Sequence, residues 1–90
     1  MKSQKEVAQE WQARGFSCDR WIDPPGQRWE NFTHQVDELV MVVEGEVEFK
    51  IGATVYHPQM GEELLIPAKT PHSVRNIGRT TSHWLYGYKR

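Results

Sequence analysis

The sequence is short of several features that would indicate a function directly. A single cysteine, Cys18, excludes an internal disulfide bond. The 11 lysine and arginine residues are balanced by 12 aspartate and glutamate residues, so the chain lacks the basic surface that nucleic acids and anionic membranes attract. No apolar run approaches the roughly 20 residues that span a bilayer, and no signal peptide is recognisable. We therefore expect a soluble cytoplasmic protein that binds neither nucleic acid nor membrane.

The first residues carry the signals of a short helix. Ser3 and Glu6 have the spacing of a capping box, in which each residue satisfies a free backbone N–H of the other. Val7 and Trp11 lie one turn apart and form a narrow apolar stripe. The sequence therefore predicts a helix over residues 4–14 that lies against a sheet.

After residue 15 the pattern changes to short β-strands separated by turn residues such as Pro24-Pro25-Gly26. The clearest strand alternates apolar and polar side chains, as a half-exposed antiparallel strand does. The eight predicted strands lie at residues 16–22, 27–33, 38–43, 46–51, 54–57, 63–66, 73–76 and 80–88. We therefore expect residues 16–90 to form one all-β sandwich or barrel, with the helical segment 1–15 packed on it.

The predicted strand over residues 38–43 is apolar on both faces, so both faces should be covered. Leu39, Met41 and Val43 form its outward set. They are too apolar for solvent and should meet either the N-terminal helix or a second subunit. This outward set is our reason for expecting a homodimer.

Three residues with metal-binding side chains are expected to meet inside the domain. His34 and Glu38 are four residues apart, so a strand through both would point both side chains to one face. His72 arrives from a second strand. Two imidazoles and one carboxylate suit a divalent metal such as Fe, Mn, Ni or Zn. A buried glutamate without a cation is costly, which favours this interpretation over a relic site whose side chains bond to one another or to water.

With these motifs the sequence resembles the cupin family, over about residues 29–88. The residues that fit the family's two motifs are His34, Glu38 and Gly45 in the first, and Gly61, Pro67, His72 and Asn76 in the second. The resemblance implies an all-β fold, a double-stranded β-helix or jelly-roll barrel of about eight antiparallel strands, here with a short N-terminal helix. It also implies three of the four usual metal ligands. The family carries many different reactions on this one barrel, so the resemblance names no activity.

Two positions depart from the motifs. Phe32 stands where the family has a further histidine, and it would share a face with His34 and Glu38. It removes one ligand and fills part of the cavity, which leaves a metal with open coordination positions. Lys69 stands at a turn where the usual glycine would allow φ > 0, which predicts a turn of different shape and a cation near the mouth.

Several further residues are weaker candidates for the pocket. Asn76 shares the face of His72, although hydrogen bonding to a turn or the backbone is the simpler interpretation. Cys18 is expected to be a small buried hydrophobe, but it is also the only soft replacement ligand. His83 is expected on the surface or in packing, and would be a candidate acid or base if it pointed inward. The remaining aromatic residues either fill the core or form a pocket wall that stacks a flat or apolar ligand: Trp21, Trp29, Trp84, Tyr86 and Tyr88.

The sequence leaves the function open between different classes of protein. One is a metal-dependent enzyme, dioxygenase-like or isomerase-like, acting on a small organic molecule that the metal orients and polarises. Another is a non-catalytic barrel that binds or senses a small molecule and has a degenerate metal site. A third is a purely structural barrel. No general base, nucleophile or cofactor motif decides among them.

Overall fold

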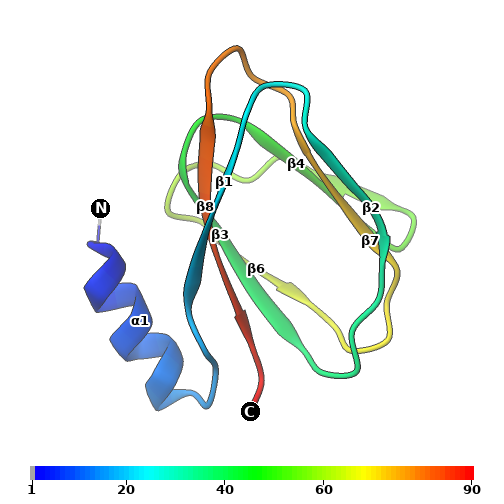
Figure 1. Cartoon of the computed structure of the whole chain (residues 1–90). Coiled ribbons are helices and arrows are strands. Elements are labelled where there is room, and N and C mark those ends of the chain that lie inside the picture. Colours follow the sequence, from blue (N-terminus) through cyan, green and yellow to red (C-terminus); the bar gives the residue numbers. More distant parts are fainter. Residues whose placement is uncertain (1) are drawn as a thin grey trace.

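The computed structural model describes residues 2–90, which form one helix and eight strands in two facing antiparallel sheets (Figure 1). The elements in chain order are α1 (Gln4–Ala13), β1 (Asp19–Asp23), β2 (Arg28–Phe32), β3 (Glu38–Glu44), β4 (Val47–Ile51), β5 (Thr54–Tyr56), β6 (Glu63–Ile66), β7 (His72–Asn76) and β8 (Ser82–Tyr88). The first sheet has the strand order β1-β8-β3-β6 and the second the order β2-β7-β4-β5. The expected all-β jelly-roll fold is confirmed.

The predicted elements are found with small shifts of their ends. The first strand begins at Asp19 rather than at Phe16, because Phe16 is buried in the core under the helix and its backbone forms only an isolated bridge, to Lys89 just after β8. The predicted capping box is present: the Ser3 hydroxyl accepts from the Glu6 backbone, and the Glu6 carboxylate accepts from the Ser3 backbone. No helix in the part of the chain that the structure describes has the length and apolar character needed to cross a bilayer.

Side-chain bonds fix the helix on the outer side of the first sheet. The Trp11 indole N–H and the Arg14 guanidinium both donate to the carboxylate of Glu63 on β6, at 2.9 Å for each bond. The helix and the segment after it also lie close to β8, which requires a glycine at position 87. A Cβ at Gly87 would overlap the Ser17 carbonyl and the Trp11 ring. The helix therefore closes over the centre of this sheet.

Strand β3 belongs to two separate apolar cores. Val40 and Val42 point between the sheets, whereas Leu39 and Met41 pack beneath α1 with Val43 at the margin. The outward set therefore meets the helix, the first of the two alternatives that the sequence left open. Because the helix covers this face, the set no longer argues for a second subunit, and the homodimer stays a prediction without that support.

The covered face makes a matched pair of mutations possible. Leu39 and Leu65 are cross-strand partners on β3 and β6, but their side chains are 1% and 51% exposed. We expect Leu39→Ala to lower the free energy of unfolding by about 2–5 kcal/mol, because it leaves a cavity under the helix. Leu65→Ala should cost less than about 1 kcal/mol, because solvent already covers that side chain. Urea denaturation measures both, and equal losses would show that the helix does not form a core with β3.

Candidate metal centre

The structure brings His34, Glu38 and His72 together at one end of the barrel. Glu38 is the first residue of β3 and His72 the first of β7, and both are almost fully buried. The Glu38 Oε1 atom lies 3.5 Å from His34 Nε2 and 3.4 Å from His72 Nε2. One potential ligand atom from each residue lies within 4.8 Å of the others. The three residues therefore form a cluster that could hold a metal ion.

His34 reaches the cluster by a different route from the one expected. No strand runs through His34 and Glu38, because β2 ends at Phe32 and His34 lies in the loop before β3. The His34 carbonyl accepts from the Lys69 N–H at 2.7 Å, which ties this loop to the turn before β7. Lys69 has φ of 62°, so the lysine keeps the left-handed backbone that a glycine would allow. The predicted change of turn shape at Lys69 is therefore not supported by its backbone.

In the neutral form of His72, acceptor atoms of His72 and Glu38 face each other with no proton between them. The His72 Nδ1 lies 3.1 Å from the Thr70 carbonyl, which can only accept, so Nδ1 carries a proton, and in the neutral form of the ring the Nε2 lone pair points toward Glu38. Burial lowers the pKa of His72, but the adjacent Glu38 carboxylate and Thr70 carbonyl favour the protonated ring more strongly, so the net pKa is raised. Glu38 Oε1 is buried with no hydrogen-bond partner. A proton or a metal ion is required between these acceptors.

A phenol lies beside the cluster. The Tyr88 hydroxyl is 3.5 Å from His34 Nε2. Burial, and then the negative charge of Glu38, raise the pKa of Tyr88 to about 12. The hydroxyl therefore keeps its proton at neutral pH and can act as a hydrogen-bond donor toward a bound molecule.

A cavity of about 220 Å³ opens next to the cluster. Its floor is buried and consists of Glu38, His72, Val74 and Trp84. The rest of its lining is a set of partly exposed rings that we call the aromatic belt: Trp21, Trp29, Phe32, His34, Tyr88 and Tyr86.

The aromatic belt is a closed circuit. Each ring contacts the next in the order given, and Tyr86 contacts Trp21 again, with consecutive centroids 4.8 to 6.3 Å apart. Trp21 stands nearly perpendicular to both Trp29 and Tyr86, at 79° and 74°. Four of the five aromatic residues left undecided by the sequence thus form a wall, while Trp84 packs in the core and on the cavity floor.

One buried carboxylate holds all three indoles of the cavity lining, and sequence reasoning missed it. Asp23, at the end of β1, is 3% exposed. Its Oδ1 accepts from the indole N–H of Trp21 at 2.9 Å and of Trp29 at 3.0 Å, and its Oδ2 accepts from that of Trp84 at 3.1 Å. The only signal in the sequence was that tryptophans need a hydrogen-bond partner when buried, which does not say which acid supplies it.

The other candidate residues lie away from the cavity lining. Asn76 is buried, but its amide bonds to the Asp23 and Thr80 carbonyls and to the Gly78 N–H, so it closes a turn. Cys18 packs beside the core under the helix, and burial raises the pKa of its thiol.

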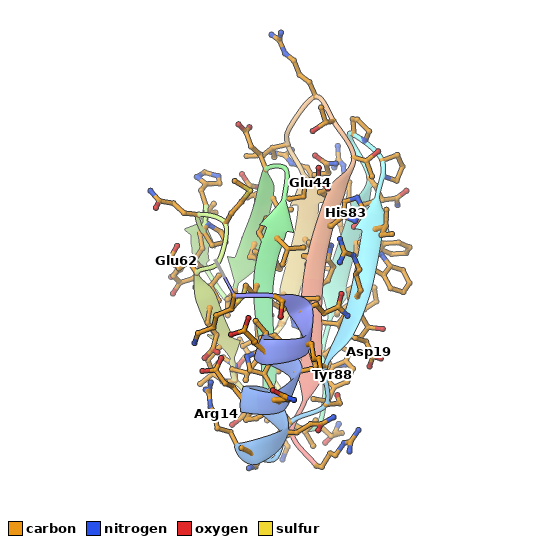
Figure 2. The ribbon with its side chains drawn as sticks, turned by 90° about the vertical axis from the view of Figure 1, so that its left-hand side faces the viewer. Arg14, Asp19, Glu44, Glu62, His83 and Tyr88 are labelled. Atoms are coloured by element: carbon orange, nitrogen blue, oxygen red, sulfur yellow. The ribbon has the colours of Figure 1, made fainter. Side chains whose placement is uncertain are left out.

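His83 faces the helix side of the first sheet rather than the cavity. Figure 2 shows it beyond the N-terminal end of α1. Its Nε2 lies 3.3 Å from a carboxylate oxygen of Glu44, and its Nδ1 faces Arg20. An inward acid or base at this position is therefore excluded, and the surface interpretation applies.

Comparison with known proteins gives one family. The family model described as "Cupin domain" matches residues 19–88. Similar solved structures include the cupin domain of an XRE family transcriptional regulator from Enterobacter cloacae, with TM-score 0.76, 24% identity, and coverage of 89% of this chain and 87% of that one. The plu4264 protein from Photorhabdus luminescens has TM-score 0.76 and 21% identity, and the match covers 84% of this chain and 63% of that one.

A third similar structure is an oxalate oxidase, with TM-score 0.73 and 25% identity. The match covers 84% of this chain but only 42% of that one. No curated protein matches the chain. The chain thus spans less than two thirds of the Photorhabdus protein and of the oxidase, and most of the Enterobacter domain.

The three indole hydrogen bonds to Asp23 predict that substitutions of the two aspartates of β1 differ in their effect on stability. Asp23→Asn replaces one carboxylate oxygen by an amide that donates, so at least one indole N–H loses its acceptor. We expect a loss of about 1–3 kcal/mol in the free energy of unfolding and a shifted tryptophan emission spectrum. Asp19→Asn, at an exposed position of the same strand, should change the free energy by no more than about 0.5 kcal/mol. Equal behaviour of the two variants would contradict the role of Asp23.

Proposed function

Because the chain belongs to the cupin family, we propose that it binds one divalent first-row metal ion through His34, Glu38 and His72 and presents it to a small molecule in the barrel. The observation that carries the proposal is Glu38 Oε1, a buried carboxylate oxygen with no hydrogen-bond partner between two imidazole nitrogens at 3.5 and 3.4 Å. Two nitrogens and one oxygen suit Fe, Mn, Ni or Zn. The residues present therefore fit a metal.

The charge of the barrel interior supports the same proposal. Two carboxylates, Asp23 and Glu38, are 3% and 4% exposed. Among residues 2–90, no lysine or arginine is buried with them. Asp23 is satisfied by neutral indole donors, but Glu38 is not. A buried anion without a partner is costly, and a bound cation removes that cost.

The residues around the cluster suit a metal with accessible positions. The Phe32 ring lies 6.3 Å from the His34 ring and 6.1 Å from the His72 ring, between centroids, and offers no donor atom. When bound, the metal would supply Lewis-acid polarisation of an oxygen donor on the small molecule. The Tyr88 hydroxyl, beside His34, would donate a hydrogen bond to the same molecule.

A non-catalytic binding or sensing barrel is the second candidate function. It is favoured by the cavity lining, in which the only titratable side chains besides the three proposed ligands are Tyr86 and Tyr88. The pKa of both phenols is raised, chiefly by burial. Neither is a base at neutral pH, so the chain itself supplies no general base in the cavity. An enzyme built on this site would depend on the metal for its chemistry, as in a dioxygenase-like or isomerase-like reaction on a small organic molecule.

Two expectations from the sequence stay proposals. We retain a cytoplasmic location on the basis of the unpaired Cys18. We retain a homodimer only because a small domain gains apolar burial by association. Neither is needed for the metal centre, whose three ligand residues come from one chain.

The metal proposal is tested by elemental analysis of protein purified without a histidine tag and loaded with Fe, Mn, Ni or Zn. We expect close to one metal ion per chain in the wild-type protein. In His72→Ala and Glu38→Gln we expect the metal content per chain to fall roughly tenfold or more, because each substitution removes a ligand. His57→Ala is the matched control, since His57 is exposed and pairs with Glu48 outside the cavity. Wild-type protein that retains no metal under any loading condition would refute the proposal.

A further inference from the structure

We propose that the small molecule is a flat, unsaturated compound with an uncharged body and one oxygen-chelating head group, held with its body inside the aromatic belt and its head group toward His34, Glu38 and His72. This inference rests on the proposed metal site. It concerns which class of molecule the cavity selects, and it follows from the size, charge and rigidity of the lining.

The size of the cavity suits one ring and a small head group. A dry cavity of roughly 150 Å³ lined by apolar side chains holds a benzene molecule. The cavity here is about 220 Å³. Glu38 and His72 are part of the lining of this cavity. An aromatic ring with a chelating group of a few atoms fits in this space, whereas a small aliphatic acid leaves the belt without contacts.

The charge of the lining selects against a second anionic group. No lysine or arginine lines the cavity, and Lys69, which the sequence predicted near the mouth, is not part of it. A carboxylate on the body of the molecule would leave water without gaining a cation, which is unfavourable. Oxalate, the compound named in the similar oxidase, carries two carboxylates and no ring. The belt therefore favours a different class of compound.

The rings of the belt are held in place before any molecule binds. Asp23 fixes the indoles of Trp21 and Trp29 in the belt and of Trp84 on the floor. Trp21 presents its ring almost perpendicular to those of Trp29 and Tyr86, so a flat guest meets both ring faces and ring edges, the two favoured aromatic geometries. Rigid walls lose little entropy on binding. Asp23 is thus a positioning residue for the belt.

The first test compares two probes that share a head group. Protein loaded with Ni(II), with its metal content measured beforehand, is titrated calorimetrically with benzohydroxamate and with acetohydroxamate. Both probes present the same two oxygens, and they differ only in the ring. We expect benzohydroxamate to bind at least about tenfold more tightly, because its ring is buried in the belt. Equal affinities would overturn the inference.

The second test examines charge on the body of the probe. A 4-carbamoyl and a 4-carboxylate derivative of benzohydroxamate have nearly the same shape, and only the second adds an anion. We expect the carboxylate to bind at least about tenfold more weakly, because it is desolvated without a cationic partner. An equal or tighter carboxylate would show that the cavity accepts anions and would overturn the inference.

Matched variants locate the effect in the belt. Trp21 and Tyr56 are similarly exposed, at 39% and 38%, but only Trp21 lines the cavity. Trp21→Leu should reduce the ratio of the benzohydroxamate affinity to the acetohydroxamate affinity. Tyr56→Leu should leave this ratio unchanged. An unchanged ratio in both would overturn the assignment to the belt. The two wild-type titrations decide the inference even if Trp21→Leu does not fold.

The failure of each proposal gives a different result. Protein that takes up no metal refutes the metal site, and with it the chelating role of the head group. Protein that takes up one metal ion but binds both hydroxamates equally retains the metal site and refutes the ligand class. Binding of benzohydroxamate with the same affinity to metal-free protein would assign the cavity to aromatic compounds and refute the part of the metal in their binding.

Discussion

The cavity depends on one carboxylate that accepts three indole hydrogen bonds. Asp23 ends β1, an edge strand of the first sheet, and its partners come from both sheets: Trp21 and Trp84 from the first, and Trp29 from the second. Strands β1 and β2 are not paired with each other, so no backbone ladder joins the sheets along this edge. The buried carboxylate links the two sheets through side chains, next to the hydrogen bond from the Asn76 amide to the Asp23 carbonyl. It also holds the tryptophans at the rim and floor of the cavity, where apolar rings without such bonds would collapse and fill it.

The barrel contains two buried carboxylates whose surroundings differ in kind. Both lose the same solvation on burial. The Asp23 oxygens recover it from three neutral N–H donors at 2.9 to 3.1 Å. The Glu38 oxygen instead faces imidazole nitrogens at 3.4 and 3.5 Å, distances too long for good hydrogen bonds, and has no donor of its own. A satisfied acid has a structural role, whereas an unsatisfied acid between two potential ligands is suited to binding a cation.

Local patterns predicted the fold well, because strands, turns and the helix cap each depend on residues close in sequence. The apolar residues on both faces of β3 predicted a cover over Leu39 and Met41 but left open whether the helix or a second subunit supplies it; the helix does. The metal candidates were found by motif spacing, although the expected geometry for His34 was wrong, since a loop rather than a strand positions it. Asp23 and the closed belt were not predictable, because their contacts join four separate segments and leave no period in the sequence.

The residue that departs from the family's first motif has a positive role in this cavity. The Phe32 ring lies almost parallel to that of His34, at 11°, and also contacts Trp29. It is therefore the link that joins the tryptophan side of the belt to the histidine cluster. A histidine there would offer the metal a fourth ligand and place a polar ring in an apolar wall. Phenylalanine completes the wall and would give the proposed metal one protein donor fewer, which is consistent with a site in which the bound small molecule also contributes donor atoms.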